Sequence, residues 1–365
     1  MNVGSCRWLW AGAVGLVVIA VSYPLATKLG VFNARTSEQG SEWQRKYWEA
    51  VSKADSASFI EDWREAVRLY AEITDLRPYD PVSRYYRATA LAHVGRKAES
   101  LEQLGMSVEF GWSDVQGLRS DPVLEEVRRL PGFDKLLERA RKTGDEPIVL
   151  YVPPGLDETA AAPLIITFHG LGENPHSHIR SWKQAADRIG AVVVAPRGNK
   201  RIGGGGQGHA FQWATAGGHG GHGDLLAFHD LLQESIELAE RRATIDDHRV
   251  ILAGYSQGGS VALALLLDTP ERFCGAVVQA TGYSSRTIDR WSNPQSGDTV
   301  RVCVIVHQFD RMRPMGEEAY RALKSVGIDA RLRTVTGADH ELPLDNTARL
   351  IDAARFALGL ESTAP

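Results

Sequence analysis

The hydrophobic pattern of the chain changes after about residue 145. Beyond it, short apolar runs alternate with segments whose apolar residues recur at helical spacing. Short apolar runs bounded by turn residues are typical of strands buried on both faces of a parallel sheet. The expected strands are Leu164–Phe168, Val250–Ala253, Arg301–His307 and Ala330–Val335, and the expected helices are Ser260–Leu265, Glu317–Val326 and Asn346–Leu358. This alternation predicts a three-layer α/β domain over residues 146–365.

One serine stands between an expected strand and an expected helix. Residues 254–258 read Gly-Tyr-Ser-Gln-Gly, directly after the run Val250–Ala253. In this context the spacing is that of a nucleophile elbow, where the glycines let strand and helix approach and push the serine hydroxyl into a cleft. The string alone would be weak evidence in a chain with 36 glycines, but its flanks favour a nucleophilic role for Ser256.

A nucleophilic serine needs a base, and the base needs a third group to orient it. On a fold with this elbow the chain order is serine, acid, histidine. Asp310 follows the expected strand Arg301–His307, and His340 precedes the last expected helix, so they are the predicted acid and base. Asp339 is the nearest rival acid, but a residue adjacent to the base in sequence would usually point its side chain away from the imidazole.

Backbone N–H groups are needed to hold the oxyanion of a tetrahedral intermediate. Gln257, the residue after the nucleophile, is expected to supply one of them. Leu171 is expected to supply the other, from the loop His-Gly-Leu-Gly at 169–172 that follows the strand Leu164–Phe168. Because the donor is the main-chain amide, the Gln257 side chain is expected to be dispensable.

These motifs resemble those of a known family. His-Gly-Leu-Gly-Glu at 169–173 and Gly-Tyr-Ser-Gln-Gly-Gly at 254–259 closely resemble the oxyanion loop and elbow of the phospholipase/carboxylesterase family, which includes acyl-protein thioesterases. Leu150–Gly155 is similar, more distantly, to the start of polyhydroxybutyrate depolymerase-like and feruloyl esterase-like hydrolases. The resemblance covers about residues 147–360 and implies the same triad and the same oxyanion donors.

The acid departs from the family pattern. In these relatives it often lies four residues after a His-Gly pair, whereas here His307 is three residues before Asp310 and Gln308 replaces the glycine. His169 and His307 each end a strand close to the expected site, and both are interpreted as hydrogen-bonded scaffold.

A glycine-rich segment between Pro196 and Asp224 is expected to form a loop on the same side as the elbow. One interpretation is a mobile lid in which Trp213 is an apolar substrate contact, and relatives of the thioesterase type have a tryptophan near this point. The alternative is a solvated surface loop. His219 and His222 could ligate a metal only if they were pre-organised, which flexible glycine spacing does not provide, so no metal is predicted. Asp224 is interpreted as the cap of a following helix.

Residues Trp8–Ala26 contain no charged side chain and are about as long as a bilayer core requires. They predict a membrane anchor or a cleaved signal peptide, with Arg7 as the charged flank; a buried core helix is the least favoured interpretation. Either favoured interpretation places the catalytic domain outside the cytoplasm, anchored or exported. A polar stretch, Ser37–Ser41, then separates an N-terminal segment of residues 1–40 from the rest.

A helical domain is expected over residues 41–145. Glu65–Tyr70 and Glu99–Leu104 match at a separation of 34 residues, the period of tetratricopeptide repeats. A third stretch from Asp121 is out of register and is expected to cap the stack, and a generic helical hairpin is the alternative. The concave face of such repeats could bind a protein partner, or the repeats could brace the hydrolase.

The predicted function is hydrolysis of carboxylic esters or thioesters by an acyl-serine mechanism, with a small or lipid-like ester as substrate and no cofactor. The alternatives are a catalytically silent scaffold and a serine peptidase on the same fold. The net charge of −4 gives no reason to expect nucleic acid binding. Cys274 and Cys303 each lie in or beside an apolar strand, where buried thiols are the default, although a bridge between them stays open.

Overall fold

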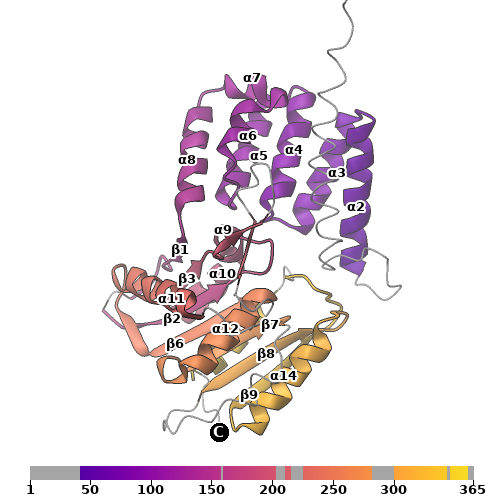
Figure 1. The fold of residues 1–365 in the computed structure, drawn as a ribbon. Coiled ribbons are helices and arrows are strands. Elements are labelled where there is room, and N and C mark those ends of the chain that lie inside the picture. The colour runs from indigo at the N-terminus through magenta and orange to yellow at the C-terminus, as the bar shows by residue number, and fades with distance from the viewer. Residues whose placement is uncertain are drawn as a thin grey trace, which may run out of the picture.

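The protein consists of a helical region followed by an α/β region, as Figure 1 shows. The computed structural model describes residues 42–157, 159–202, 210–214, 225–281, 300–342 and 346–360. The predicted segment Trp8–Ala26, the histidines His219 and His222, and Asp224 lie outside these residues. Among the described helices, none is both long enough and apolar enough to cross a membrane.

The helical region is an array of packed helices ending where the α/β region begins. Its helices are α2 (Glu42–Phe59), α3 (Trp63–Leu76), α4 (Pro81–His93), α5 (Lys97–Glu109), α6 (Val115–Ser120), α7 (Glu125–Arg128) and α8 (Phe133–Asp145). Aspartates start several of them, because a carboxylate oxygen can accept from the free amides of the first turn. Asp62 accepts from the Glu65 amide, and Asp80 accepts from the Val82 and Ser83 amides ahead of α4, whose first residue is Pro81.

The two segments that match at 34 residues lie in α3 and α5. The first is followed by the 13-residue helix α4, but the second is followed by α6, which has only six residues. The second unit therefore departs from a pair of full-length helices, and the tetratricopeptide assignment stays a prediction.

A seven-stranded mixed sheet forms the centre of the α/β region, in the order β1-β3-β2-β6-β7-β8-β9. Strand β1 runs antiparallel to β3, and all the other neighbours are parallel. The strands are β1 (Ile148–Tyr151), β2 (Ala162–Phe168), β3 (Val192–Pro196), β6 (Ile245–Tyr255), β7 (Gly275–Gln279), β8 (Arg301–His307) and β9 (Asp329–Val335). A separate two-stranded ribbon pairs β4 (Lys200–Arg201) with β5 (Phe211–Gln212).

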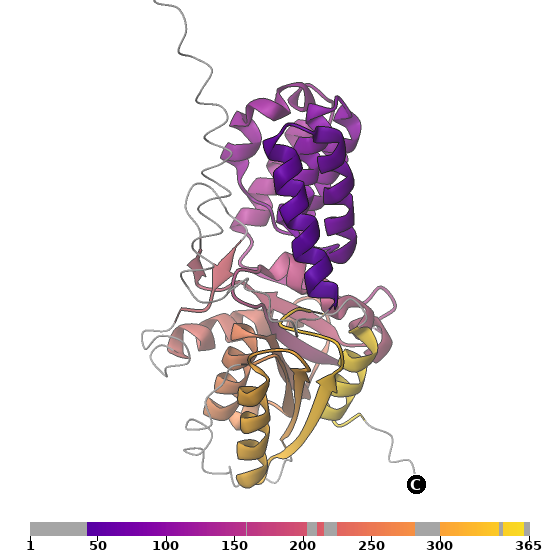
Figure 2. The same ribbon diagram turned by 90° about the vertical axis from the view of Figure 1, so that its right-hand side faces the viewer.

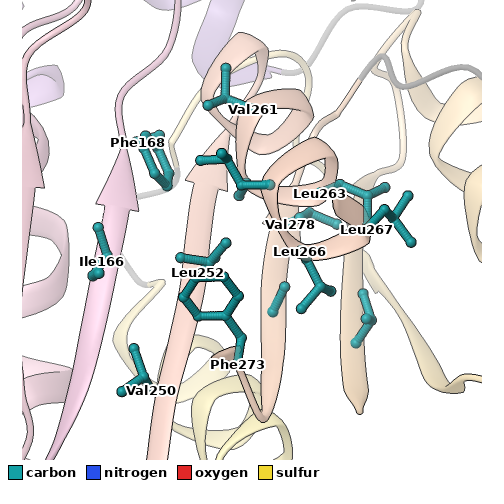
Figure 3. Close-up of a cluster of buried hydrophobic side chains, with 14 of the residues drawn as sticks. Ile166, Phe168, Val250, Leu252, Val261, Leu263, Leu266, Leu267, Phe273 and Val278 are labelled. Atoms are coloured by element: carbon teal, nitrogen blue, oxygen red, sulfur yellow. The ribbon is translucent and has the colours of Figure 1, made fainter. Parts of the chain in front are cut away.

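Helices cover both faces of this sheet. One face packs against α11 (Leu225–Glu240), α12 (Gln257–Asp268) and α14 (Arg313–Ser325), and Figure 3 shows part of this core, where α12 lies over the strands that carry Leu252 and Val278. The other face packs against α10 (Arg180–Ile189) and α15 (Thr347–Ala357), with the short helix α9 (Pro175–His178) preceding α10. The structure confirms the predicted three-layer α/β architecture.

The expected elements are found with shifted ends. Strand β6 begins at Ile245 rather than Val250, because its first half is polar and partly exposed and so lacks an apolar run. Helix α14 begins at Arg313, ahead of the expected Glu317, since Pro314 fits the first turn of a helix.

The helical region stands over the end of the sheet at which the parallel strands finish (Figures 1 and 2). Its lower end contacts segments that follow β2 and β3. Arg180 forms an ion pair with Glu109 and lies over the Phe110 ring, 5.4 Å from its centroid. The Arg197 guanidinium donates to the Gly144 carbonyl at 2.7 Å. Gly111, at φ +110°, lies so close to Asn174 that an added Cβ would be 2.3 Å from Asn174 Oδ1.

Candidate active site

Ser256 is held in a conformation that most residues avoid. It links β6 to α12 with φ 52° and ψ −119°. The flanking glycines are required sterically, because a Cβ on Gly254 would lie 2.3 Å from the Gly258 carbonyl oxygen and a Cβ on Gly258 would lie 2.0 Å from the Phe168 carbonyl oxygen. The close packing of β6, α12 and β2 therefore fixes the strained turn. The turn presents the serine hydroxyl at the carboxyl end of the sheet.

The structure brings the three predicted triad residues into one hydrogen-bonded chain. Ser256 Oγ lies 2.8 Å from His340 Nε2, and His340 Nδ1 lies 2.9 Å from Asp310 Oδ2. With Nδ1 protonated toward Asp310, Nε2 is free to accept the serine proton, which is the tautomer that a general base needs. Asp310 is only 4% exposed, and the Met312 amide donates to its other oxygen at 2.8 Å.

Asp339, the rival acid, has a different set of partners. Its Oδ1 accepts from the His340 backbone amide at 2.7 Å, so the carboxylate faces the main chain beside it. Burial raises the pKa of Asp339. The geometry thus supports Asp310 as the orienting acid despite its departure from the family spacing.

The two predicted oxyanion donors come from the ends of two neighbouring strands, β2 and β6. Gln257 is the first residue of α12, and Leu171 lies in the loop after β2. Because Gln257 is in the first turn of its helix, its amide has no acceptor within that helix. The loop around Leu171 is ordered by its own contacts: the Gly170 amide donates to Glu173 Oε2 at 2.8 Å, and Gly172 takes φ +84°.

Tyr255 packs between the two halves of the site. Its ring lies 5.4 Å from the His340 ring, and a Cβ on Gly170 would meet it at 2.8 Å. Burial raises the pKa of Tyr255 well above its usual range, so the phenol stays neutral beside the triad. The side chain acts as a spacer that separates the oxyanion loop from the base.

His169 and His307 are buried scaffold residues, as the sequence indicated. His169 Nε2 accepts from the Gly198 amide at 2.9 Å, and burial lowers the pKa of His169 to about 4. His307 lies 2.5 Å from the Asp339 carbonyl oxygen through Nδ1 and 2.9 Å from the Gln279 amide nitrogen through Nε2. Burial also lowers the pKa of His307, so both imidazoles are neutral. His307 therefore holds the backbone immediately before His340.

The position of Trp213 corrects the sequence prediction. The side chain is 3% exposed and packs in the core against Phe168 and Phe228, with ring centroids 5.2 and 5.7 Å away. Its indole N–H donates to the His169 carbonyl at 2.8 Å. A side chain enclosed in this way supports the oxyanion loop rather than forming a substrate-contacting wall, and the glycine-rich sequence around it concealed its burial.

Gln257 also differs from the expectation. Its side-chain amide forms two hydrogen bonds with the Trp213 backbone, each 3.0 Å long. Sequence reasoning assigned only the main-chain amide a role, because no local signal links positions 44 residues apart.

The described residues also bear on the metal and disulfide expectations from the sequence. They contain no group of three or more histidine, cysteine, aspartate or glutamate side chains that could hold a metal ion. Cys274 and Cys303 are not joined by a disulfide, so the bridge left open by the sequence is not formed.

Comparison with known proteins places this site in a family. The model of the phospholipase/carboxylesterase family matches residues 156–353. The chain belongs to this family. The match confirms the predicted family resemblance and covers most of the α/β region.

Individual relatives are more distant. A poly(3-hydroxybutyrate) depolymerase from Ralstonia pickettii is 29% identical over 126 residues, which are 34% of this chain and 23% of the relative. The chain thus matches under a quarter of that protein. An uncharacterized protein from Bacillus cereus ATCC 10987 is similar at 15% identity and a TM-score of 0.47, covering 86% of this chain and 99% of its own. Esterase PE8 is similar at 21% identity and a TM-score of 0.45, covering 58% and 98%.

Proposed function

We propose that the protein hydrolyses carboxylic esters or thioesters through an acyl-serine intermediate. The observation that carries the proposal is the continuous chain from Ser256 Oγ through His340 to Asp310, with hydrogen bonds of 2.8 and 2.9 Å. Esters and thioesters need only a nucleophile, a proton shuttle and an oxyanion site, all of which these residues can supply.

In the acylation step Ser256 Oγ attacks the substrate carbonyl carbon while His340 Nε2 takes the hydroxyl proton. Asp310 stabilises the resulting imidazolium, and the Gln257 and Leu171 amides hold the oxyanion. Collapse of the tetrahedral intermediate breaks the bond to the alcohol or thiol, which leaves with the proton from His340. Water then attacks the acyl-serine by the same route, releasing the carboxylic acid and restoring Ser256.

The experiment that tests this function pairs active-site labelling with a substrate series. Purified protein is treated with a fluorophosphonate and, in parallel, assayed on p-nitrophenyl esters and acyl thioesters with acyl chains of increasing length. We expect the fluorophosphonate to label the wild type but not Ser256→Ala. We also expect the wild type to hydrolyse the substrates, and the acyl-chain length that is hydrolysed fastest will indicate the size of the acyl pocket. A correctly folded wild type that neither labels nor turns over any substrate would instead favour a silent scaffold.

We propose further that the helical region braces the hydrolase rather than serving mainly as a partner-binding module. Three observations support a fixed docking: the Glu109–Arg180 ion pair, the Arg197 bond to the Gly144 carbonyl, and the contact of Gly111 with Asn174. Asn174 directly follows Glu173, whose carboxylate orders the oxyanion loop, so the docking supports the site itself.

The location of the protein is a separate proposal that rests on the sequence. The apolar segment Trp8–Ala26 motivates a membrane-anchored or exported enzyme with its catalytic domain outside the cytoplasm. A chain starting at Ser41 is expected to be soluble and as active as the full chain on small esters. Partitioning of that shortened chain into membranes would contradict the proposal that Trp8–Ala26 is the anchor.

A further inference from the structure

One short segment, Phe211–Trp213, is bonded to both halves of the oxyanion site. The segment forms hydrogen bonds with Gln257 and with residues 169–173. Gln257 and residues 169–173 are far apart in the chain. Two sets of hydrogen bonds make the connection, and ring packing around Trp213 holds the segment in place.

The first set joins the segment to the elbow. The Trp213 amide donates to Gln257 Oε1 and Gln257 Nε2 donates to the Trp213 carbonyl, both at 3.0 Å. The side-chain amide is thus used as donor and acceptor toward a single residue, which fixes its orientation. Since the main-chain amide of the same glutamine is the first oxyanion donor, this pair restrains the start of α12 where that donor lies.

The second set joins the segment to the backbone on both sides of Leu171. The Trp213 indole N–H donates to the His169 carbonyl at 2.8 Å. The Gly172 amide donates to the Phe211 carbonyl at 2.9 Å, and the Phe211 amide donates to the Glu173 carbonyl at 3.0 Å. Leu171, the second oxyanion donor, is therefore held from before and after by the same three-residue segment.

The third observation is that the indole is itself immobilised. Trp213 lies 5.0 Å from the His169 ring and packs edge-on to Phe168 and Phe228 in the core. A ring packed on several sides cannot follow the oxyanion loop if the loop moves, so it anchors the loop to the sheet.

We propose that Gln257 and Trp213 are positioning residues that set the separation of the two oxyanion donors by tying both to the Phe211–Trp213 segment. An oxyanion donor acts only when it lies within hydrogen-bond distance of the oxygen in the transition state, and losing one donor costs about 10²–10³ in kcat. A support that keeps the donors in place contributes to the transition state and little to binding of the ground-state ester. The inference rests on the proposed acyl-serine function.

Two substitutions remove these bonds, and a matched control accounts for the volume that Trp213→Phe loses. Trp213→Phe keeps an aromatic ring in the core but removes the indole N–H that bonds to His169. Gln257→Met keeps the length of the side chain and the main-chain amide but removes both bonds to Trp213. Trp182→Phe is the matched control, because Trp182 is equally buried at 3% exposure but lies on the opposite face of the sheet.

We expect Trp213→Phe and Gln257→Met each to lower kcat on a p-nitrophenyl ester by about 10- to 100-fold, with KM within about twofold of the wild type. Inhibition by an aryl trifluoromethyl ketone, whose adduct with Ser256 carries an oxyanion, should weaken in proportion to the loss in kcat/KM. The double variant should lose less than the product of the two single losses, because both act through one segment. Trp182→Phe should change thermal stability with little change in kcat.

The proposal would be overturned by variants that keep wild-type kcat and ketone inhibition, or by losses that follow thermal stability alone and appear equally in Trp182→Phe. These outcomes are distinct from failure of the proposed function, in which the wild type itself shows neither ester turnover nor fluorophosphonate labelling.

Discussion

The helical region and the α/β region bury polar side chains of different kinds. In the described part of the helical region the buried polar residues are all uncharged: Thr74, Ser83, Ser100, Gln103 and Ser107. Several of them bond to nearby carbonyls, such as Ser100 to Ala88 and Ser107 to Pro81. In the α/β region the buried set includes the titratable residues His169, His178, His307, Asp310 and Glu341.

This difference shows that the α/β region, rather than the helical region, accommodates the free-energy cost of burying titratable side chains. Burying a titratable group is unfavourable unless it is paired or kept neutral, so such groups gather where chemistry requires them. Here they lie at or beside the carboxyl end of the sheet, whereas the buried polar side chains in the described part of the helical region carry only hydroxyl and amide groups. This contrast supports the proposals that the helical region braces the hydrolase and that the α/β region supplies the reacting groups.

The largest test of this division is Ser256→Ala. Removing the nucleophile should lower kcat by about five to six orders of magnitude, as loss of a triad member does in other serine hydrolases. Stability should change little, because alanine keeps the Cβ and the same backbone conformation and removes only the hydroxyl that bonds to His340. Ester turnover and urea unfolding are measured on the same preparation, and residual turnover above a few per cent would remove Ser256 from the nucleophile role.

The second test separates the two candidate acids. Asp310→Asn should lower kcat by about three to four orders of magnitude, because an amide beside Nδ1 favours the wrong histidine tautomer. Asp339→Asn should cost less than about tenfold, since its carboxylate bonds to the His340 backbone and not to the ring. The two variants are compared on one chromogenic ester, and the reverse ranking would transfer the acid role to Asp339.

The third test measures how the buried histidine His169 makes the stability of the α/β region depend on pH. Burial lowers the pKa of His169 to about 4, below the value of about 6.5 for an exposed histidine. The unfolded chain therefore binds the proton first, so the contribution of His169 is complete above about pH 6.5 and is lost as the pH falls to about 4. The loss amounts to about 3 kcal/mol in the free energy of unfolding.

Urea unfolding at pH 7, 5.5 and 4.5 measures this effect. His169→Gln should be less stable than the wild type at pH 7 but should flatten the pH dependence between about 6.5 and 4. His248→Gln is the control, because His248 is exposed, and it should leave the profile unchanged. If the free energy of unfolding of His169→Gln depended on pH as steeply as that of the wild type, other groups would be the cause of the lower stability at acidic pH.

The smallest effects are expected at the contact between the two regions. Gly111→Ala should cost about 2–3 kcal/mol, because the residue has φ +110° and its new Cβ would collide with Asn174. Arg180→Ala removes an exposed ion pair and should cost less than about 1 kcal/mol. We also expect kcat to fall in Gly111→Ala alone, because Asn174 adjoins the oxyanion loop. Equal losses in the two variants would argue against a specific brace at Gly111.

The sequence by itself determined the features that depend on neighbouring residues. Apolar runs such as Arg301–His307 predict buried strands, and the glycines around Ser256 predict the elbow, because strand burial and turn strain are encoded within a few positions. The chain order then predicts which strand ends carry Asp310 and His340. Parallel strands finish at the same edge of a sheet, which is why residues 84 positions apart, Ser256 and His340, could be expected to meet.

Only the tertiary structure decided which way the side chains around the site point and which partners they bind. Trp213 has the same local sequence whether it faces a substrate or the core, and its burial depends on Phe168 and Phe228 from other elements. The same holds for the two bonds of the Gln257 side chain and for the choice of Asp310 over Asp339, which depends on the direction of each carboxylate at the site. Packing between distant segments sets these directions, and packing is a property of the folded chain rather than of any short stretch of sequence.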